Sequence, residues 1–461
     1  MPHGRRPVAE VLCDPARAHV YEHGWQSRSP AGRYPVTGQP PRPRLPDDLV
    51  VGYRPDRPGP VRGFQGEGLL ALETEPGGPA RLWAAPRPAA EVPSIRADPG
   101  AGPAGRLRLT VSADGEVAES VHPSLAAAVG TWADRAAATA GVAAAPSLAP
   151  AWCACCAFGC GDGAGGPGHD ELVRELAAMD RLGLDVAVVV LDGAHRSGIG
   201  DWRPEPLAAL ARPVRDGGRR AGARIAPFLV AEGSRLAAEH PGWLVDGADA
   251  GGLAGRRLGV LDVTHPGAAG HLRDLVAQLV AAGIDHLVLD ALYAGALAGR
   301  RHADAPVLAA YREGLRLVRE AAGPGCTLVG AAAPLLPSIG LVDAMRTGPG
   351  VAPVWAPPGG DQSHASLSSA LATTGARTWQ HGRLWVSAPG CLLAAPWVGR
   401  RRVWAGHLAA AAGAASSGDR PSLLDQAGVE LTRRVLRPSS PFPVAWAPDD
   451  GPEPAVVALL A

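Results

Sequence analysis

The chain has 461 residues, enough for a sizeable buried core and for two or three domains, or for one barrel with appendages. Its 44 basic residues, all of them arginine, balance 44 acidic residues to a formal net charge of zero. A balanced chain has no general attraction for nucleic acid or for an anionic membrane, so neither is expected as a partner.

The first 122 residues are expected to form a β-sandwich-like domain. They are rich in Pro, Gly and Arg, and turn residues separate short extended stretches such as LLALE, ARLWAA and GRLRLTVSA. Residues 124–140 then show a helical pattern for which Ser124 is a suitable N-cap. With a linker that contains proline, this helix makes up the segment 123–150.

Residues 151–416 alternate between strand-like and helix-like stretches, which predicts a central parallel (β/α)8 TIM barrel. The expected strands are AWCACCAF, DVAVVVLD, ARIAPFLV, LGVLDVT, DHLVLDAL, CTLVGAA, LVDAMR and RLWVSA. Several of them lack alternation, as strands buried on both faces do. Residues 417–461 are expected to add a few short β strands, so the predicted fold is a multidomain α/β protein.

In a parallel barrel the chemistry takes place at the carboxyl ends of the strands. Asp290 ends an apolar strand and is a candidate nucleophile, base or ligand, although it could instead cap the next turn. Arg346 could hold a carboxylate or a sugar hydroxyl, or pair with Asp290 or Asp343. The polar residues at the predicted strand ends are Asp192, Asp262, Asp290, Arg346 and Ser387.

No cofactor is expected. The glycine-rich pieces GAGGPG and GPG lack the spacing and the lysine of a phosphate-binding loop, and no His-Glu-x-x-His string is present. His195 and Arg196 follow Asp192 on a loop, where a solvated side chain is the simpler interpretation of a histidine than a catalytic base.

Four of the seven cysteines, Cys153, Cys155, Cys156 and Cys160, crowd into the string WCACCAFGC. This spacing lacks the paired C-x-x-C knuckles of a structural zinc site, so unligated thiols are favoured over a metal site. The N-terminus has no apolar core of signal-peptide length, and no stretch of about 18 apolar residues occurs. We therefore expect a cytoplasmic protein with reduced thiols.

Ten strings spread collinearly through most of the chain resemble the α-galactosidases of glycoside hydrolase family 36, especially the actinobacterial-type branch. They are HGWQSRSPAGRYP, GYRPDRPGP, GFQGEGLLAL, GIGDW, APFLV, LDVTHP, LVLDALYAGALAGRRH, APLLPSIGLVDAMR, WQHGRLWV and LRPSSPFPV. The resemblance implies an N-terminal β-sandwich, a (β/α)8 barrel and a C-terminal β domain. It also implies retaining hydrolysis of α-galactosides by two aspartates, one a nucleophile and the other a general acid/base.

The resemblance places the nucleophile at Asp290 and the acid/base at Gly350. The nucleophile motif of the family reads Lys-hydrophobic-Asp-Phe, and here Val288 and Ala291 stand at its first and last positions. The acid/base motif, similar to Met-Arg-x-x-Pro-Asp-Thr-Ala-Pro, here reads MRTGPGVAP, so a glycine stands where the proton donor should be. Asp343 or Asp361 could substitute as the acid.

The sugar pocket implied by the resemblance is altered as well. Of the paired aspartates after the second barrel strand only Asp192 remains, followed by Gly193, and a pocket tryptophan on the third strand corresponds to Arg224. Further departures fall at Arg28, Arg33, Cys155, Cys156, Ala331 and the loop SAPGC. The remaining candidates for substrate binding are Asp192, Arg346, Trp25 and Trp202.

The scaffold strings survive while the pocket residues change together, which predicts an α-galactosidase-like retaining glycoside hydrolase of weak or lost activity. Loss of a general acid alone costs about 10²–10⁴-fold in rate. A non-catalytic carbohydrate-binding pseudoenzyme, a respecialised glycosidase and mutational drift in a GC-rich gene stay open as alternatives. An oligosaccharide α-galactoside is the expected small-molecule partner, and the resemblance is compatible with a homo-oligomer.

Overall fold

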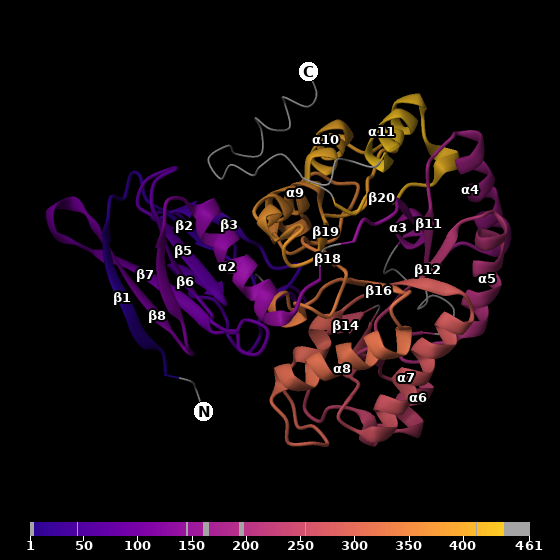
Figure 1. Ribbon diagram of the computed structural model, residues 1–461, viewed down its shortest axis with the longest axis horizontal. Helices are drawn as coiled ribbons and strands as arrows, with labels where there is room; N and C mark the ends of the chain where they lie inside the picture. Colours follow the sequence, from indigo (N-terminus) through magenta and orange to yellow (C-terminus); the bar gives the residue numbers. More distant parts are fainter. Residues whose placement is uncertain are drawn as a thin grey trace.

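The computed structural model describes residues 4–43, 45–143, 146–159, 166–192, 198–253, 255–411 and 413–437. Two antiparallel sheets at the N-terminal side lie beside a curled parallel sheet that helices surround (Figure 1). Among these residues, no helix combines the length and the apolar composition needed to cross a bilayer.

The N-terminal part consists of two antiparallel sheets that share one apolar core. Their strand orders are β1-β8-β7-β4 and β3-β2-β5-β6-β9. The first sheet buries Ile95 and Val111 in this core, and the second buries Leu72 and Trp83. The bounds are β1 Arg6–Cys13, β2 His19–Glu22, β3 Gly32–Pro35, β4 Phe64–Glu67, β5 Leu69–Glu73, β6 Ala80–Ala84, β7 Ser94–Ala101, β8 Leu107–Ala113 and β9 Ala118–His122, with α1 at Pro46–Gly52 and a 3-10 turn η1 at Pro103–Gly105.

The second sheet is buried on both faces. All five residues of β5 are buried, and its side chains alternate between the shared core and a larger cluster that helix α2 (Leu125–Ala140) helps to form. The predicted N-cap of this helix is confirmed, because the Ser124 side chain accepts the backbone N–H of Ala127 at 3.2 Å. The helix therefore covers the face of the sheet that the first sheet leaves open.

The central sheet has eight parallel strands in the order β19-β18-β17-β16-β12-β11-β10-β20. Beyond these pairings, the backbone N–H of Ala414, just before β20, donates to the carbonyl of Ser387 in β19 at 3.0 Å. The sheet is consistent with a TIM-like barrel. Its strands are β10 Ala151–Cys153, β11 Val188–Asp192, β12 Arg220–Ile225, β16 Ile284–Leu289, β17 Thr327–Gly330, β18 Ala344–Arg346, β19 Val386–Ala388 and β20 Ser416–Ser417.

Helices line the outside of the central sheet (Figure 1). In α5, Leu207, Leu210, Ala211 and Val214 are buried, so one face at helical spacing packs inward. The remaining elements are α3 Ala154–Phe158, α4 His169–Arg181, α5 Pro204–Asp216, α6 Arg235–Glu239, α7 Pro266–Ala281, α8 Val307–Ala322, α9 Leu367–Gly375, α10 Arg401–Ala411 and α11 Gln426–Leu436, with 3-10 turns η2 Pro241–Trp243, η3 Leu292–Ala296, η4 Leu336–Ser338, η5 Pro358–Gly360, η6 Thr378–Gln380 and η7 Pro421–Leu423.

Two strand predictions are wrong. The string LGVLDVT is no barrel strand, because β15 (Arg256–Val260) pairs antiparallel with β13 (Leu229–Ala231) and with β14 (Gly252–Leu253) in a small separate sheet. The eighth strand of the central sheet is instead β20. The expected β structure of the C-terminal segment is also wrong where α11 lies, and residues 438–461 are outside the described part.

A loop of the N-terminal part is fastened to the carboxyl side of the central sheet. The Ser27 N–H donates to the Ala333 carbonyl at 3.0 Å, and the Leu335 N–H donates to the Trp25 carbonyl at 3.1 Å. Arg377, fully buried, donates to the carbonyl groups of Gln26, Ser27, Ser29 and Thr347 at 2.7–3.1 Å. These bonds hold residues 25–29 beside the strand ends.

Candidate functional site

Asp192, Arg224 and Asp290 meet at the carboxyl ends of three adjacent strands. Asp192 ends β11, Arg224 is the penultimate residue of β12, and Asp290 directly follows β16. The register pairs Asp192 with Arg224 and Arg224 with Val288. Carboxyl ends of parallel strands share one edge of a sheet, so the three side chains converge there.

The guanidinium of Arg224 lies against the carboxylate of Asp290. Its Nε and Nη2 donate to Oδ2 of Asp290 at 2.8 and 2.5 Å, and its Nη1 is 3.4 Å from Oδ2 of Asp192. The other oxygen of Asp290, Oδ1, accepts the backbone N–H of Ala291 at 2.8 Å. Both oxygens of the candidate nucleophile are therefore engaged.

The electrostatics of this pair keep both groups charged. Burial raises the pKa of Asp290, but Arg224, Arg28 and the Ala291 N–H outweigh burial, so the pKa lies below the usual range of a carboxyl group. Burial lowers the pKa of Arg224, yet Asp290 and Asp192 raise it overall. Arg28 thus adds positive charge near Asp290 from the N-terminal loop.

Gly350 provides no proton donor, but its surroundings leave room for a side chain. It lies half-buried on the loop after β18. A Cβ placed on Gly350 would meet only the Cβ of Ala365, at 3.5 Å, which is an ordinary contact. Position 350 is thus sterically open.

Both residues considered as substitute acids take part in local hydrogen bonding. Asp343 precedes β18, at the end of the sheet opposite Asp290, and its Oδ2 accepts from Arg319 and from the Leu328 N–H, both at 2.7 Å. Asp361 is buried, and its Oδ1 accepts the N–H and the hydroxyl of Ser363, both at 2.7 Å. These contacts give both carboxylates a role in holding local structure.

Asp262 and Ser387, the remaining strand-end candidates, both lie in local hydrogen-bond networks. Asp262 is buried and accepts the N–H and hydroxyl of Thr264 together with the N–H of His302, so it ties two loops together. The Ser387 N–H donates to Nδ1 of His381 at 3.1 Å. Gly193, His195 and Arg196 lie outside the described residues.

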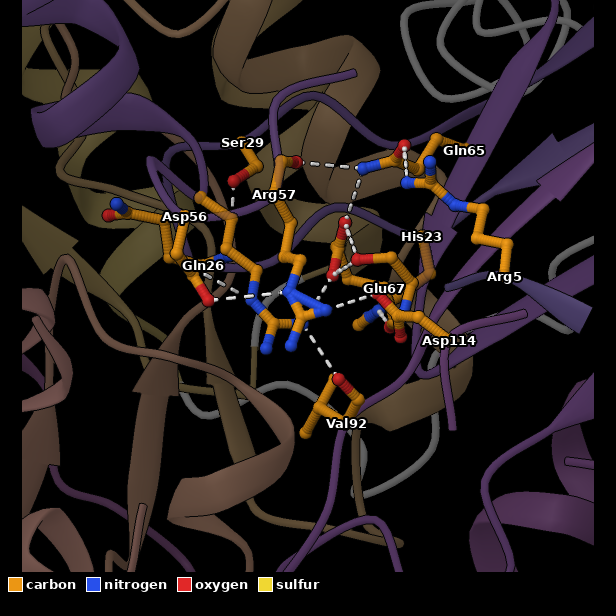
Figure 2. A network of polar contacts seen from close by, with 12 residues as sticks. Arg5, His23, Gln26, Ser29, Asp56, Arg57, Gln65, Glu67, Val92 and Asp114 are labelled. Atoms are coloured by element: carbon orange, nitrogen blue, oxygen red, sulfur yellow. Dashed lines mark hydrogen bonds and ion pairs between the residues drawn. The ribbon is translucent and has the colours of Figure 1, made fainter. Parts of the chain in front are cut away.

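The side chains of Trp25 and Trp202 pack against other residues of the protein. Trp25 is buried, and the guanidinium of Arg54 lies 4.4 Å from its ring centroid. Arg54 in turn donates to Glu67 at 2.7 Å, within a polar network that also includes Gln65 (Figure 2). Trp202, on the loop before α5, is half-buried against the main core.

Three thiols meet beside this site, one of which the sequence did not indicate. Cys153 ends β10, Cys156 lies in α3 and Cys391 follows β19, and their Sγ atoms all lie within 4.8 Å of one another. The Cys156 and Cys391 Sγ atoms are 3.5 Å apart. The signal that could have indicated Cys391 is its place three residues after a barrel strand, in the loop SAPGC.

The expectation of reduced thiols holds for Cys153 and Cys156 but not for Cys155, which is disulfide-bonded. Cys160 lies outside the described residues. Cys155 Sγ also accepts from Nη1 of Arg224, at 2.6 Å. Within the cysteine-rich string, Cys155 therefore contacts the Arg224–Asp290 group, whereas Cys153 and Cys156 belong to the group of three thiols.

Arg346 lies next to the thiols rather than in an ion pair with Asp290 or Asp343. Its Nη2 is 3.4 Å from the Cys391 Sγ. Hydrogen bonds from Cys153 and Cys156, assisted by the charge of Arg346, hold the pKa of Cys391 well below the usual thiol value despite burial. The positive charge of Arg346 therefore adds to the effect of the two thiol hydrogen bonds on Cys391.

The structure was compared with known proteins. It is similar to TtGalA, an α-galactosidase from Thermus thermophilus in complex with p-nitrophenyl α-D-galactopyranoside, with a TM-score of 0.74 and 26% identity over 94% of this chain and 89% of that one. The same enzyme in complex with stachyose has a TM-score of 0.73 and 26% identity, over 95% of each chain. The GH36 α-galactosidase AgaA from Geobacillus stearothermophilus matches with a TM-score of 0.58 and 14% identity, over 93% of this chain and 61% of that chain. No protein-family model matches the chain. The chain has an α-galactosidase-like fold of glycoside hydrolase family 36.

Proposed function

We propose that this protein is an α-galactosidase-like retaining glycoside hydrolase, built on a (β/α)8 barrel, whose hydrolytic activity is weak or lost. The observation that carries the proposal is the binding of Asp290 by Arg224. The likeness to an enzyme seen with p-nitrophenyl α-galactopyranoside and stachyose supports α-galactosides as the ligand class.

Retaining hydrolysis requires one carboxylate oxygen to attack the anomeric carbon. In this chain one oxygen of Asp290 holds two guanidinium nitrogens and the other holds a backbone N–H. Attack would require the ion pair to open. Leaving one charge of a fully buried pair without its partner costs about 3–5 kcal/mol, and the cost of separating the two groups here is reduced because 27% of the Arg224 side chain is exposed.

The second loss is at Gly350, because no carboxyl group there can protonate the leaving oxygen or activate water. That loss costs about 10²–10⁴-fold in rate, in addition to the cost of freeing Asp290. Activated leaving groups such as nitrophenol need little protonation, so any residual turnover should be greatest on them.

Binding of a carbohydrate without turnover is the alternative that the ion pair also favours. Arg224 and Asp192 remain partly exposed at the strand ends, with 27% and 13% of their side chains accessible. Such groups can hydrogen-bond hydroxyl groups while Asp290 stays paired. The protein would then act as a sugar-binding pseudoenzyme.

The deciding experiment is release of nitrophenol from p-nitrophenyl α-galactopyranoside by the wild type and by Asp290→Asn. Both should stay at the background rate, or the wild type slightly above it. Azide-stimulated release that depends on Asp290 would show a working nucleophile beside an absent base. Rapid Asp290-dependent release without azide would contradict the proposal, and a thermal shift by stachyose without turnover would favour the pseudoenzyme.

A further inference from the structure

We propose that Cys153, Cys156 and Cys391 form a binding site for one Zn²⁺ ion at the carboxyl ends of the central strands. The proposal is independent of glycoside hydrolysis. It rests on the positions of the three Sγ atoms and on the charge next to them. The four-cysteine string by itself did not predict this site, because its ligands come from two segments 235 residues apart in sequence.

The spacing of the sulfur atoms suits a tetrahedral ion. A Zn–S bond of about 2.3 Å places two thiolate ligands about 3.8 Å apart. All three Sγ atoms lie within 4.8 Å of one another, and those of Cys156 and Cys391 are 3.5 Å apart. Displacements of the three sulfur atoms by a fraction of an ångström would bring them around one ion.

The backbone holds these ligands in place without the ion. Cys153 and Cys391 are 8% and 0% exposed, and with Cys155 they form an apolar cluster against which Cys156 and Val351 pack. The three ligands come from the end of β10, from α3 and from the loop after β19. Because the segments are already packed, little conformational entropy is lost when an ion binds.

The charge of the surroundings favours a divalent ion. Zn²⁺ with three thiolates carries one net negative charge, and the Arg346 guanidinium at 3.4 Å from the Cys391 Sγ balances it. A monovalent ion such as Cu⁺ would leave one negative charge uncompensated in a buried site. Three protein ligands leave the fourth tetrahedral position for water or another small ligand, the pattern of catalytic rather than structural zinc.

The test uses the full chain, purified with a reducing agent, stripped with a chelator and titrated with Zn²⁺ against a chromophoric competitor. One equivalent should bind tightly to the wild type. Cys391→Ser and Cys156→Ser should lose this binding. Cys326→Ser should keep it, because Cys326 is a buried thiol that precedes β17 at the other end of the sheet. Co²⁺ in place of Zn²⁺ should give an intense thiolate-to-metal charge-transfer band with the wild type and with Cys326→Ser, but not with Cys391→Ser or Cys156→Ser.

A second readout does not depend on the folding of variants. Zn²⁺ should protect Cys153, Cys156 and Cys391 of the wild type from maleimide, as located by mass spectrometry of peptides. The proposal is overturned if the wild type takes up no stoichiometric Zn²⁺, if protection falls on other cysteines, or if Cys391→Ser binds as well as Cys326→Ser. It is also overturned if Cys156 and Cys391 form a disulfide and the protein, once reduced again to free thiols, still takes up no metal.

Discussion

The guanidinium of Arg224 binds one oxygen of Asp290 through two nitrogen atoms, at 2.8 and 2.5 Å, on adjacent strands of the central sheet. The guanidinium neutralises the charge of the candidate nucleophile. The resemblance to family-36 α-galactosidases implies a neutral pocket tryptophan at position 224, so we propose that Arg224 changes the electrostatics expected of such a site.

The Arg224–Asp290 pair should contribute a measurable coupling energy to stability. We consider a double-mutant cycle with Arg224→Gln and Asp290→Asn. The losses of stability of the two single variants should add up to more than the loss of the double variant, because each single variant leaves one buried charge unpaired. We expect a coupling of about 1–3 kcal/mol, reduced from the fully buried case by partial exposure. Urea unfolding measures it. Additive effects would mean that the pair contributes no specific stabilisation.

Restoring catalysis should require two changes. Gly350→Asp alone should stay inactive on p-nitrophenyl α-galactopyranoside and stachyose, because Arg224 still holds the nucleophile. Gly350→Asp combined with Arg224→Trp should raise the rate, by about 10²-fold or more on stachyose if the acid is positioned correctly. Product release, assayed as galactose, measures the gain.

A neighbouring glycine provides the matched control for that experiment. A Cβ on Gly350 meets Ala365 at an ordinary 3.5 Å, whereas one on Gly348 would lie 2.5 Å from Cγ2 of Thr374. Gly348→Asp should therefore lower the melting temperature while Gly350→Asp leaves it nearly unchanged. If the double variant folds and stays inactive, the remainder of the sugar pocket is also non-functional.

Buried histidines should make the protein less stable in mild acid. Burial lowers the pKa of His286 and His407 to about 4 and that of His23 to about 3. An unfolded histidine titrates near about 6.5, so between about pH 6.5 and 4 the unfolded chain binds protons that the folded chain does not. The free energy of unfolding should be greatest above this window and fall as the pH drops through it.

His407→Gln tests this assignment. The Nε2 of His407 lies 2.7 Å from Oγ1 of Thr374, and glutamine can keep a hydrogen bond without titrating. Urea unfolding at about pH 7.5 and about pH 5 should show a smaller difference for His407→Gln than for the wild type. His169→Gln, at an exposed helix start, should behave as the wild type. If the free energy of unfolding depends on pH equally in His407→Gln and His169→Gln, the role of His407 is contradicted.

Substitution of Arg377 should be among the most destabilising changes outside the strand-end site. It is fully buried and donates to four carbonyl groups that join the N-terminal loop to the barrel side. Arg377→Met would leave these acceptors unpaired, at about 1–3 kcal/mol for each that water cannot reach. Thermal unfolding should shift down strongly or split into two transitions. A single, nearly unshifted transition would show that the loop is held by packing alone.

The sequence alone determined the features that depend on local pattern. Ser124 as a helix cap, strands with apolar residues on both faces, and Asp290 at a strand tip all follow from neighbours in the chain. The lack of a carboxyl group at Gly350 is likewise a fact of covalent structure, as is the set of strings that led to the α-galactosidase-like fold.

Tertiary structure decided which distant residues meet. The two-residue strand β20 has no pattern of its own and is defined by pairing with β10, while LGVLDVT looked like a barrel strand but pairs elsewhere. Arg224 pairs with Asp290, and Cys391 joins Cys153, only because the sheet curls and sets their register. Periodicity reports which face of an element is buried, but a side chain's partners depend on contacts made across the curled sheet, and those contacts set its charge and its chemistry.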